Sequence, residues 1–140
     1  MDRKLGISEI LEKASGEKKV ADRVRILQEN STPILQHLLR LHYTPGVKWL
    51  LPPGSPPFNR NAIPGQEGNL YAEWRRFYLF FPREGDNLKP AARESIFIQI
   101  LESIDPRDAD LIISIKDGKM PYPGITRAVV DKAFPDLIVS

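Results

Sequence analysis

The spacing of apolar residues predicts helices along most of the chain. In seven segments, apolar positions recur every three or four residues, as they do on the buried face of an α-helix. These segments are about residues 8–16, 18–28, 33–41, 70–80, 90–101, 106–118 and 126–134. The pattern therefore predicts an all-α fold, with residues 1–140 forming a single compact domain of about seven short helices.

Residues with strong end preferences mark several helix boundaries. Thr32-Pro33 and Asp105-Pro106 each combine an N-cap residue with a proline suited to the first turn of a helix. Thr126 is placed to cap the last helix, Ser8 to cap the first, and Gly16 to end it. These signals predict where helices begin, independently of the apolar spacing.

A long proline-rich loop is predicted at about residues 44–68, where the helical spacing fails. Six of the thirteen prolines fall in this region. They are Pro45, Pro52, Pro53, Pro56, Pro57 and Pro64. A connection of this length is either a packed, extended loop or a mobile one. The apolar side chains of Trp49, Leu50, Leu51 and Phe58 favour a loop pinned across the surface.

An aromatic stripe marks the predicted helix at 70–80. Its members are Leu70, Trp74, Phe77, Tyr78 and Phe81. Aromatic residues at helical spacing usually belong to the core, although exposed ones can also stack on nucleic-acid bases. We interpret this stripe as core and keep base stacking as the alternative.

Charge is distributed unevenly along the chain. The formal net charge is +2, from 20 basic and 18 acidic residues. Up to Arg60 there are ten basic and six acidic residues, whereas the remainder has ten basic and twelve acidic. The basic first half favours approach to phosphate, while two solvated helix faces would give the same pattern.

Composition narrows the classes of protein further. Hydrophobic residues make up 41% and charged residues 27%, as in an ordinary soluble domain, and there is no cysteine. The sequence thus lacks a disulfide framework and a thiolate metal site, which suits a reducing cytoplasm. Its apolar runs are too short for a membrane span, and its first residues do not form a signal peptide.

Catalytic and metal-binding patterns are weak. His37 and His42 are five residues apart, so on one helix they point about 140° from each other and cannot share a metal ion. Asp105, Asp108 and Asp110 resemble a metal cluster but are better explained by the positive end of a helix dipole. We expect no metal, no cofactor and no enzymatic activity.

The segment Lys116-Asp117-Gly118 is close to a known catalytic motif but does not match it. Nucleotidyl transferases of the ligase type use a lysine nucleophile in the order Lys, any residue, Asp, Gly. Here the lysine and the aspartate are adjacent. We therefore interpret Gly118 as a helix C-cap and exclude an adenylating enzyme.

The segment from Lys119 to Arg127 has features of a phosphate-binding turn. Gly124 and Thr126 lead into a helix, and basic residues lie on both sides. Glycine lets the backbone approach a ligand closely, and helix N-termini attract phosphates. A plain helix–helix corner capped by Thr126 is the alternative.

Both ends of the chain carry short motifs of a known family. In the first third of the chain, the motifs are Ile7–Leu11, Lys18-Lys19, Ile26-Leu27, Leu38–Tyr43 and Val47–Leu50. In the last third, they are Lys119, Gly124, Lys132 and Phe134-Pro135. In these motifs the chain resembles the amino-terminal DNA-binding domain of ATP-dependent DNA ligases, notably those of T-even bacteriophages. It is also similar to small proteins of T-even-like tailed phages, especially phages of cyanobacteria. The resemblance covers about residues 5–53 and 94–138.

The resemblance implies an all-helical domain that grips duplex DNA through the minor groove and the phosphate backbone. It implies that Lys119, Gly124 and Lys132 lie on or beside the DNA-facing corner. The sequence departs from the family at Met120, Pro121 and Pro123, which replace an acidic, a leucine and an aliphatic residue. The segment 52–89 has no counterpart in the family.

Two functional hypotheses follow. The first is a non-catalytic phage accessory protein that binds nucleic acid mainly through phosphate contacts. Its candidate residues are Lys18, Lys19, Arg40, Lys48, Lys119, Gly124, Arg127 and Lys132. The second is an adaptor or virion component that binds a phage or host protein. Its candidate residues are Phe58, Trp74, Arg75 and Arg76. Either protein would act in the cytoplasm of an infected cell or in the virion.

Overall fold

The protein is all-α in the part of the chain that the structure describes. A computed structural model describes residues 5–63, 65 and 69–138, and these residues form seven α-helices and no strand. The helices are α1 (Ile7–Ser15), α2 (Val20–Glu29), α3 (Pro33–Tyr43), α4 (Leu70–Glu73), α5 (Pro90–Ser103), α6 (Pro106–Lys116) and α7 (Arg127–Ala133). Two short 3-10 helices, η1 (Trp74–Phe80) and η2 (Gly85–Asn87), lie between α4 and α5. The predicted fold class is confirmed.

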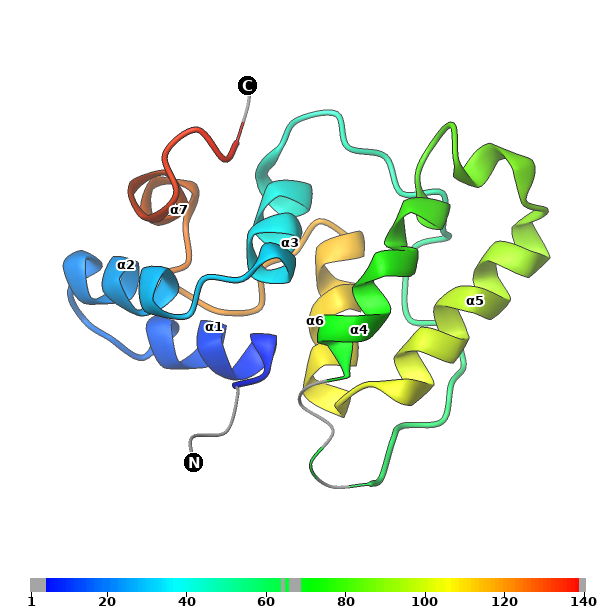
Figure 1. The fold of residues 1–140 in the computed structure, drawn as a ribbon, viewed down its shortest axis with the longest axis horizontal. Helices are drawn as coiled ribbons and strands as arrows, with labels where there is room; N and C mark the ends of the chain where they lie inside the picture. The colour runs from blue at the N-terminus through cyan, green and yellow to red at the C-terminus, as the bar shows by residue number, and fades with distance from the viewer. Residues whose placement is uncertain (1–4, 64, 66–68, 139–140) are drawn as a thin grey trace.

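Helix α6 lies at the centre of the molecule. It packs against α1, α3 and α5, while α2 packs against both α1 and α7. In Figure 1, α1, α2 and α7 lie at one end of the molecule and α5 lies at the other. Leu11, Leu39, Ile100 and Ile112 are fully buried, so one continuous core joins these helices.

Three of the predicted N-caps are confirmed by their hydrogen bonds. The Thr32 hydroxyl accepts from the backbone N–H of Leu35 at 3.3 Å. The Asp105 carboxylate accepts from Arg107 at 2.8 Å, and the Thr126 hydroxyl from Val129 at 3.3 Å. Each bond satisfies a backbone donor that the first turn of a helix leaves without a partner.

The predicted start of the first helix is wrong. The N-cap residue is Gly6, whose N–H donates to the Glu9 carboxylate at 3.1 Å. Ser8 lies inside α1 and is buried, because its backbone N–H donates to Asp108 at 2.9 Å and its hydroxyl to the Arg107 carbonyl at 2.8 Å. These contacts dock α1 on the start of α6.

The second helix also begins later than predicted. It starts at Val20, with Lys19 as its N-cap residue, and extends to Glu29. Both lysines of the Lys18-Lys19 pair therefore lie in the turn between α1 and α2.

The predicted single helix at 70–80 is divided. Four residues form α4, and residues 74–80 form the 3-10 helix η1. A 3-10 helix has three residues per turn, so positions i and i+3 lie on one face. Phe77 and Phe80 are accordingly buried, Trp74 packs against the core, and Tyr78 is 55% exposed. The interpretation of the stripe as core is confirmed for all its members except Tyr78.

The proline-rich loop is pinned along its described length, as its apolar anchors indicated. Helix α5 holds it through Arg93, which donates to the Leu50 carbonyl at 3.3 Å, and through Glu102, which accepts from Asn59 N–H at 2.6 Å. Asn61 donates to the carbonyl of Ser103 at 3.2 Å. Pro64 and residues 66–68 of the predicted loop lie outside the described residues.

Asp108 is a carboxyl group in the core contact between α1 and α6. It is 1% exposed, and only one of its oxygens has a hydrogen-bond partner. Burial raises the pKa of Asp108 to about 6, against the opposing hydrogen bond from Ser8. Because the folded state disfavours the ionised carboxylate, Asp108 destabilises the fold as pH rises through this pKa.

We expect this effect to be visible in the pH dependence of stability. Between pH values of about 4 and 7, the free energy of unfolding of wild type should fall by about 2 kcal/mol relative to Asp108→Asn. Urea denaturation of both proteins across this range measures the difference. Glu12→Gln, at an exposed position of α1, controls for the loss of one negative charge. A constant difference between wild type and Asp108→Asn would contradict the prediction.

Candidate binding surfaces

The predicted phosphate-binding turn is held by side chains at the ends of two helices, α1 and α3. The Ser15 hydroxyl at the end of α1 donates to the Pro123 carbonyl at 2.5 Å. The Tyr43 hydroxyl at the end of α3 donates to the Ile125 carbonyl. Segment 119–126 is therefore a well-anchored corner between α6 and α7, and the corner interpretation is confirmed as its structural role.

Gly124 faces the side chain of Arg23. Its φ is +84°, and a Cβ at this position would lie 2.8 Å from the Arg23 Cζ. The Arg23 Nε donates to the Glu17 carbonyl at 2.8 Å. Arg23 thus connects the turn that carries Lys18 and Lys19 to the Gly124 corner. The sequence interpretation did not include Arg23, which is half-buried in the structure.

The five candidate lysines are exposed at the surface. None of the five forms an ion pair with any residue for which the structure gives a position. They are Lys18, Lys19, Lys48, Lys119 and Lys132. The two candidate arginines differ, since Arg127 pairs with Asp131 at 3.5 Å and Arg40 donates to the Leu137 carbonyl at 3.4 Å.

The structure connects some of these positions and separates others. Lys18, Lys19 and Gly124 meet through Arg23. Lys132 belongs to α7, which packs on α2. The side-chain amide of Gln28 in α2 donates to the Ala133 carbonyl at 3.1 Å and holds α7 in place. Lys48 instead lines a shallow depression with Trp49 and Asp117 at the carboxyl end of α6.

Of the candidate residues for protein binding, Trp74 and Arg75 line one depression, and Phe58 is not part of its lining. The Trp74 ring stacks against His37 of α3, with ring centroids 5.3 Å apart. Phe58 lies in the loop beneath the Arg60 guanidinium, 5.3 Å from its ring centroid. Arg76 pairs with Glu73 at 2.6 Å, and Arg75 is exposed.

Lys116 has a role that its sequence context did not indicate. Its side chain is 2% exposed, and its ammonium group donates to the carbonyls of Pro52 at 2.8 Å and Gly54 at 3.1 Å. The ammonium group also donates to the Asp117 carboxylate at 2.6 Å. This carboxylate accepts a further hydrogen bond from the Gly54 N–H at 3.1 Å. Although burial opposes it, bonding to Lys116 and Gly54 lowers the pKa of Asp117. We call these four residues, 52, 54, 116 and 117, the lysine anchor.

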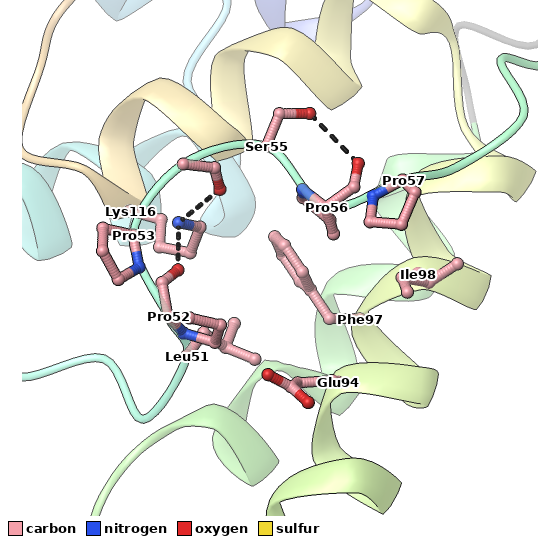
Figure 2. Close-up of a pocket in the computed structure, with 11 residues that line it drawn as sticks. Leu51, Pro52, Pro53, Ser55, Pro56, Pro57, Glu94, Phe97, Ile98 and Lys116 are labelled. Atoms are coloured by element: carbon pink, nitrogen blue, oxygen red, sulfur yellow. Dashed lines mark hydrogen bonds between the residues drawn. The ribbon is translucent and has the colours of Figure 1, made fainter.

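A groove lies between the anchored loop and α5 (Figure 2). Its volume is about 420 Å³. Four prolines and Leu51 line one side, and Glu94, Phe97 and Ile98 of α5 line the other. The groove is within the size range of small binding sites, and its lining is mostly apolar.

The titratable side chains of the described region do not gather into a metal site. No group of three His, Asp or Glu residues in the part of the chain described here could hold a metal ion. His37 and His42 contact different rings, Trp74 and Tyr43. Burial lowers the pKa of both histidines, and Arg40 adds to the effect at His37.

The fold is a small all-helical domain with two surface features. One is the basic corner, which comprises the exposed Lys18, Lys19, Lys119 and Lys132 around the Arg23–Gly124 contact, and the other is the apolar groove beside α5. Over the described residues, no helix has the length and apolarity to cross a bilayer. The chain belongs to a family of unknown function, DUF6433, whose profile matches residues 10–121. The match includes the proline-rich loop and α6. A search among curated proteins gives no match.

The contact between Arg23 and Gly124 can be tested by adding one methyl group. Gly124→Ala should destabilise the protein by more than about 2 kcal/mol, because positive φ strains alanine and its Cβ displaces Arg23. Gly46→Ala is the control, since Gly46 has a φ of +81° but open space around it. Thermal unfolding measures both losses. Equal losses would show that the Arg23 contact contributes nothing.

The lysine anchor predicts a local effect of removing its ammonium group. Lys116→Met should destabilise the protein by about 2 kcal/mol, because two carbonyls and a carboxylate lose a charged donor. Hydrogen exchange of the Gly54 amide, which donates to Asp117, should accelerate more than exchange in α1 or α2. Lys48→Met, an exposed lysine of the adjoining depression, should leave both measurements unchanged. Uniform acceleration throughout the chain would contradict a local anchor.

Proposed function

We propose that the protein is a non-catalytic phage accessory protein that binds nucleic acid through phosphate contacts at its basic corner. The observation that carries the proposal is the set of exposed lysines that form no ion pair with the described residues, in particular Lys18 and Lys19 beside the Arg23–Gly124 contact. Unpaired surface cations attract a polyanion and release its counterions on binding.

The chemistry of the corner suits backbone contacts rather than base recognition. Lysine presents a flexible point charge, whereas base recognition commonly uses the planar fork of arginine. Phosphate contacts position a protein on a duplex without reading its sequence. The proposed binding is therefore tolerant of sequence. The resemblance to ligase DNA-binding domains supports duplex DNA, and the surroundings would be the cytoplasm of an infected cell or the virion.

The anchored corner changes which atoms we expect to contact DNA. Gly124 faces Arg23, and the Thr126 hydroxyl already accepts from Val129. Phosphate would therefore be bound by side chains around the corner rather than by its backbone. The proposed contacts are Lys18, Lys19, Lys119 and Lys132, with Arg40, Lys48 and Arg127 at the margins.

A second candidate function, a protein-binding adaptor, is favoured by one observation. The groove beside α5 is apolar, and the lysine anchor holds its proline-rich wall in place. A surface of this kind fits a protein partner better than a phosphate backbone.

The proposed nucleic-acid binding should depend steeply on salt. For the four proposed lysine contacts, the affinity for a nicked duplex should fall about 150-fold when salt rises from about 50 to about 200 mM. Lys18→Glu, Lys119→Glu and Lys132→Glu should each weaken binding about fivefold or more and reduce the salt slope by about 1. Fluorescence anisotropy with a labelled duplex measures both quantities.

Lys89→Glu is the matched control for these charge reversals. Lys89 is an exposed lysine at the N-cap of α5, which lies at the other end of the molecule from α1 and α2 (Figure 1). This variant should bind like wild type. Failure of wild type to bind at low salt, or equal losses in all four variants, would overturn the proposal.

A further inference from the structure

The groove between the proline-rich loop and α5 contains one charge without a partner. Glu94 lies at its edge, beside Leu51 and Pro52 in Figure 2. Its half-buried carboxylate accepts no hydrogen bond and forms no ion pair within the described part of the chain. A carboxylate next to apolar surface loses some hydration, so a cation from outside would find a favourable position there.

The other charged group of the groove is already occupied. Lys116 donates its three ammonium hydrogens to Pro52, Gly54 and Asp117, and the dashed lines in Figure 2 mark two of these bonds. Glu94 therefore contributes the uncompensated charge of the groove, and that charge is negative. It disfavours a phosphate ligand and favours a cationic one.

The walls of the groove are held in their shape before any partner arrives. Proline fixes φ at four positions of the loop, and the lysine anchor fixes its carbonyls at 52 and 54. On the opposite wall, Glu94, Phe97 and Ile98 are three and four residues apart and share one face of α5. A preformed apolar groove loses little conformational entropy on binding.

We propose that this groove binds a peptide segment of a partner protein that presents an aromatic or large aliphatic side chain next to an arginine or lysine. The apolar side chain lies between the prolines and Phe97, and the cation pairs with Glu94. The groove volume of about 420 Å³ accommodates one large side chain with its neighbouring backbone. This proposal is independent of nucleic-acid binding, because the groove and the basic corner share no residue.

Four capped hexapeptides test the proposal on the full chain. Their sequences are Gly-Ser-Trp-Arg-Ser-Gly and the versions with Trp-Glu, Trp-Gln or Ala-Arg at the centre. In ¹H–¹⁵N NMR titrations, the Trp-Arg peptide should bind with a dissociation constant in the millimolar range. It should shift the amide signals of Leu51, Gly54 and residues 94–98. The Trp-Glu and Ala-Arg peptides should bind about fivefold or more weakly.

Substitution of the carboxylate separates the charge effect from a change in groove shape. Glu94→Gln should lower the affinity for the Trp-Arg peptide about fivefold while leaving the affinity for the Trp-Gln peptide unchanged. Glu12→Gln, at an exposed position of α1, is the matched control and should bind both peptides like wild type.

Several results would overturn the proposal. Equal binding of the Trp-Arg and Trp-Glu peptides would remove the role of Glu94. Binding of arginine amide alone as tightly as the Trp-Arg peptide would assign the groove to a small cation instead. No shift with any peptide, or shifts of the same amides by duplex DNA, would also contradict a peptide site.

Discussion

The arrangement of the protein depends on buried cations that bind the carbonyl groups of irregular backbone. A segment without regular secondary structure cannot pair its own carbonyls, and a buried cation needs acceptors, so each satisfies the other. Arg93 does this for Leu50 and Leu88, and Lys116 does it for Pro52 and Gly54. Arg93 also donates to the carbonyl of Gly85, at the start of η2. Because these cations belong to α5 and α6, the loop is fixed to two helices at once, and the groove follows from that fixation.

The same chemistry recurs at the opposite end of the molecule with a more exposed cation. Arg23 binds the Glu17 carbonyl and covers Gly124, so it joins two turns that are about a hundred residues apart in the sequence. Basic residues thus have two distinct roles in this chain. Those that bind carbonyls organise the fold, whereas the exposed lysines around them leave their charge available to solvent and to ligands.

The parts of the structure that could be predicted are those determined by local sequence. Apolar spacing and the caps at Thr32, Asp105 and Thr126 identified the helices because backbone geometry acts within a few residues. The prediction of Ser8 as an N-cap was wrong because the hydrogen-bond partner of Ser8, Asp108, is a hundred residues away in the sequence. The 3-10 helix at 74–80 was missed because aromatic residues three and four apart fit both helix types. The roles of Lys116 and Arg23, and the groove, depend on distant backbone carbonyls that leave no signal in the sequence.

The order in which the chain is synthesised gives the lysine anchor another consequence. Lys116 follows its loop acceptors by 62 and 64 residues, so the ribosome releases the loop well before the helix that holds it. At about 5–20 residues per second, the loop waits several seconds for its cation. Pro52, Pro53, Pro56 and Pro57 have no backbone N–H, so these four positions cannot donate to a strand edge during this interval.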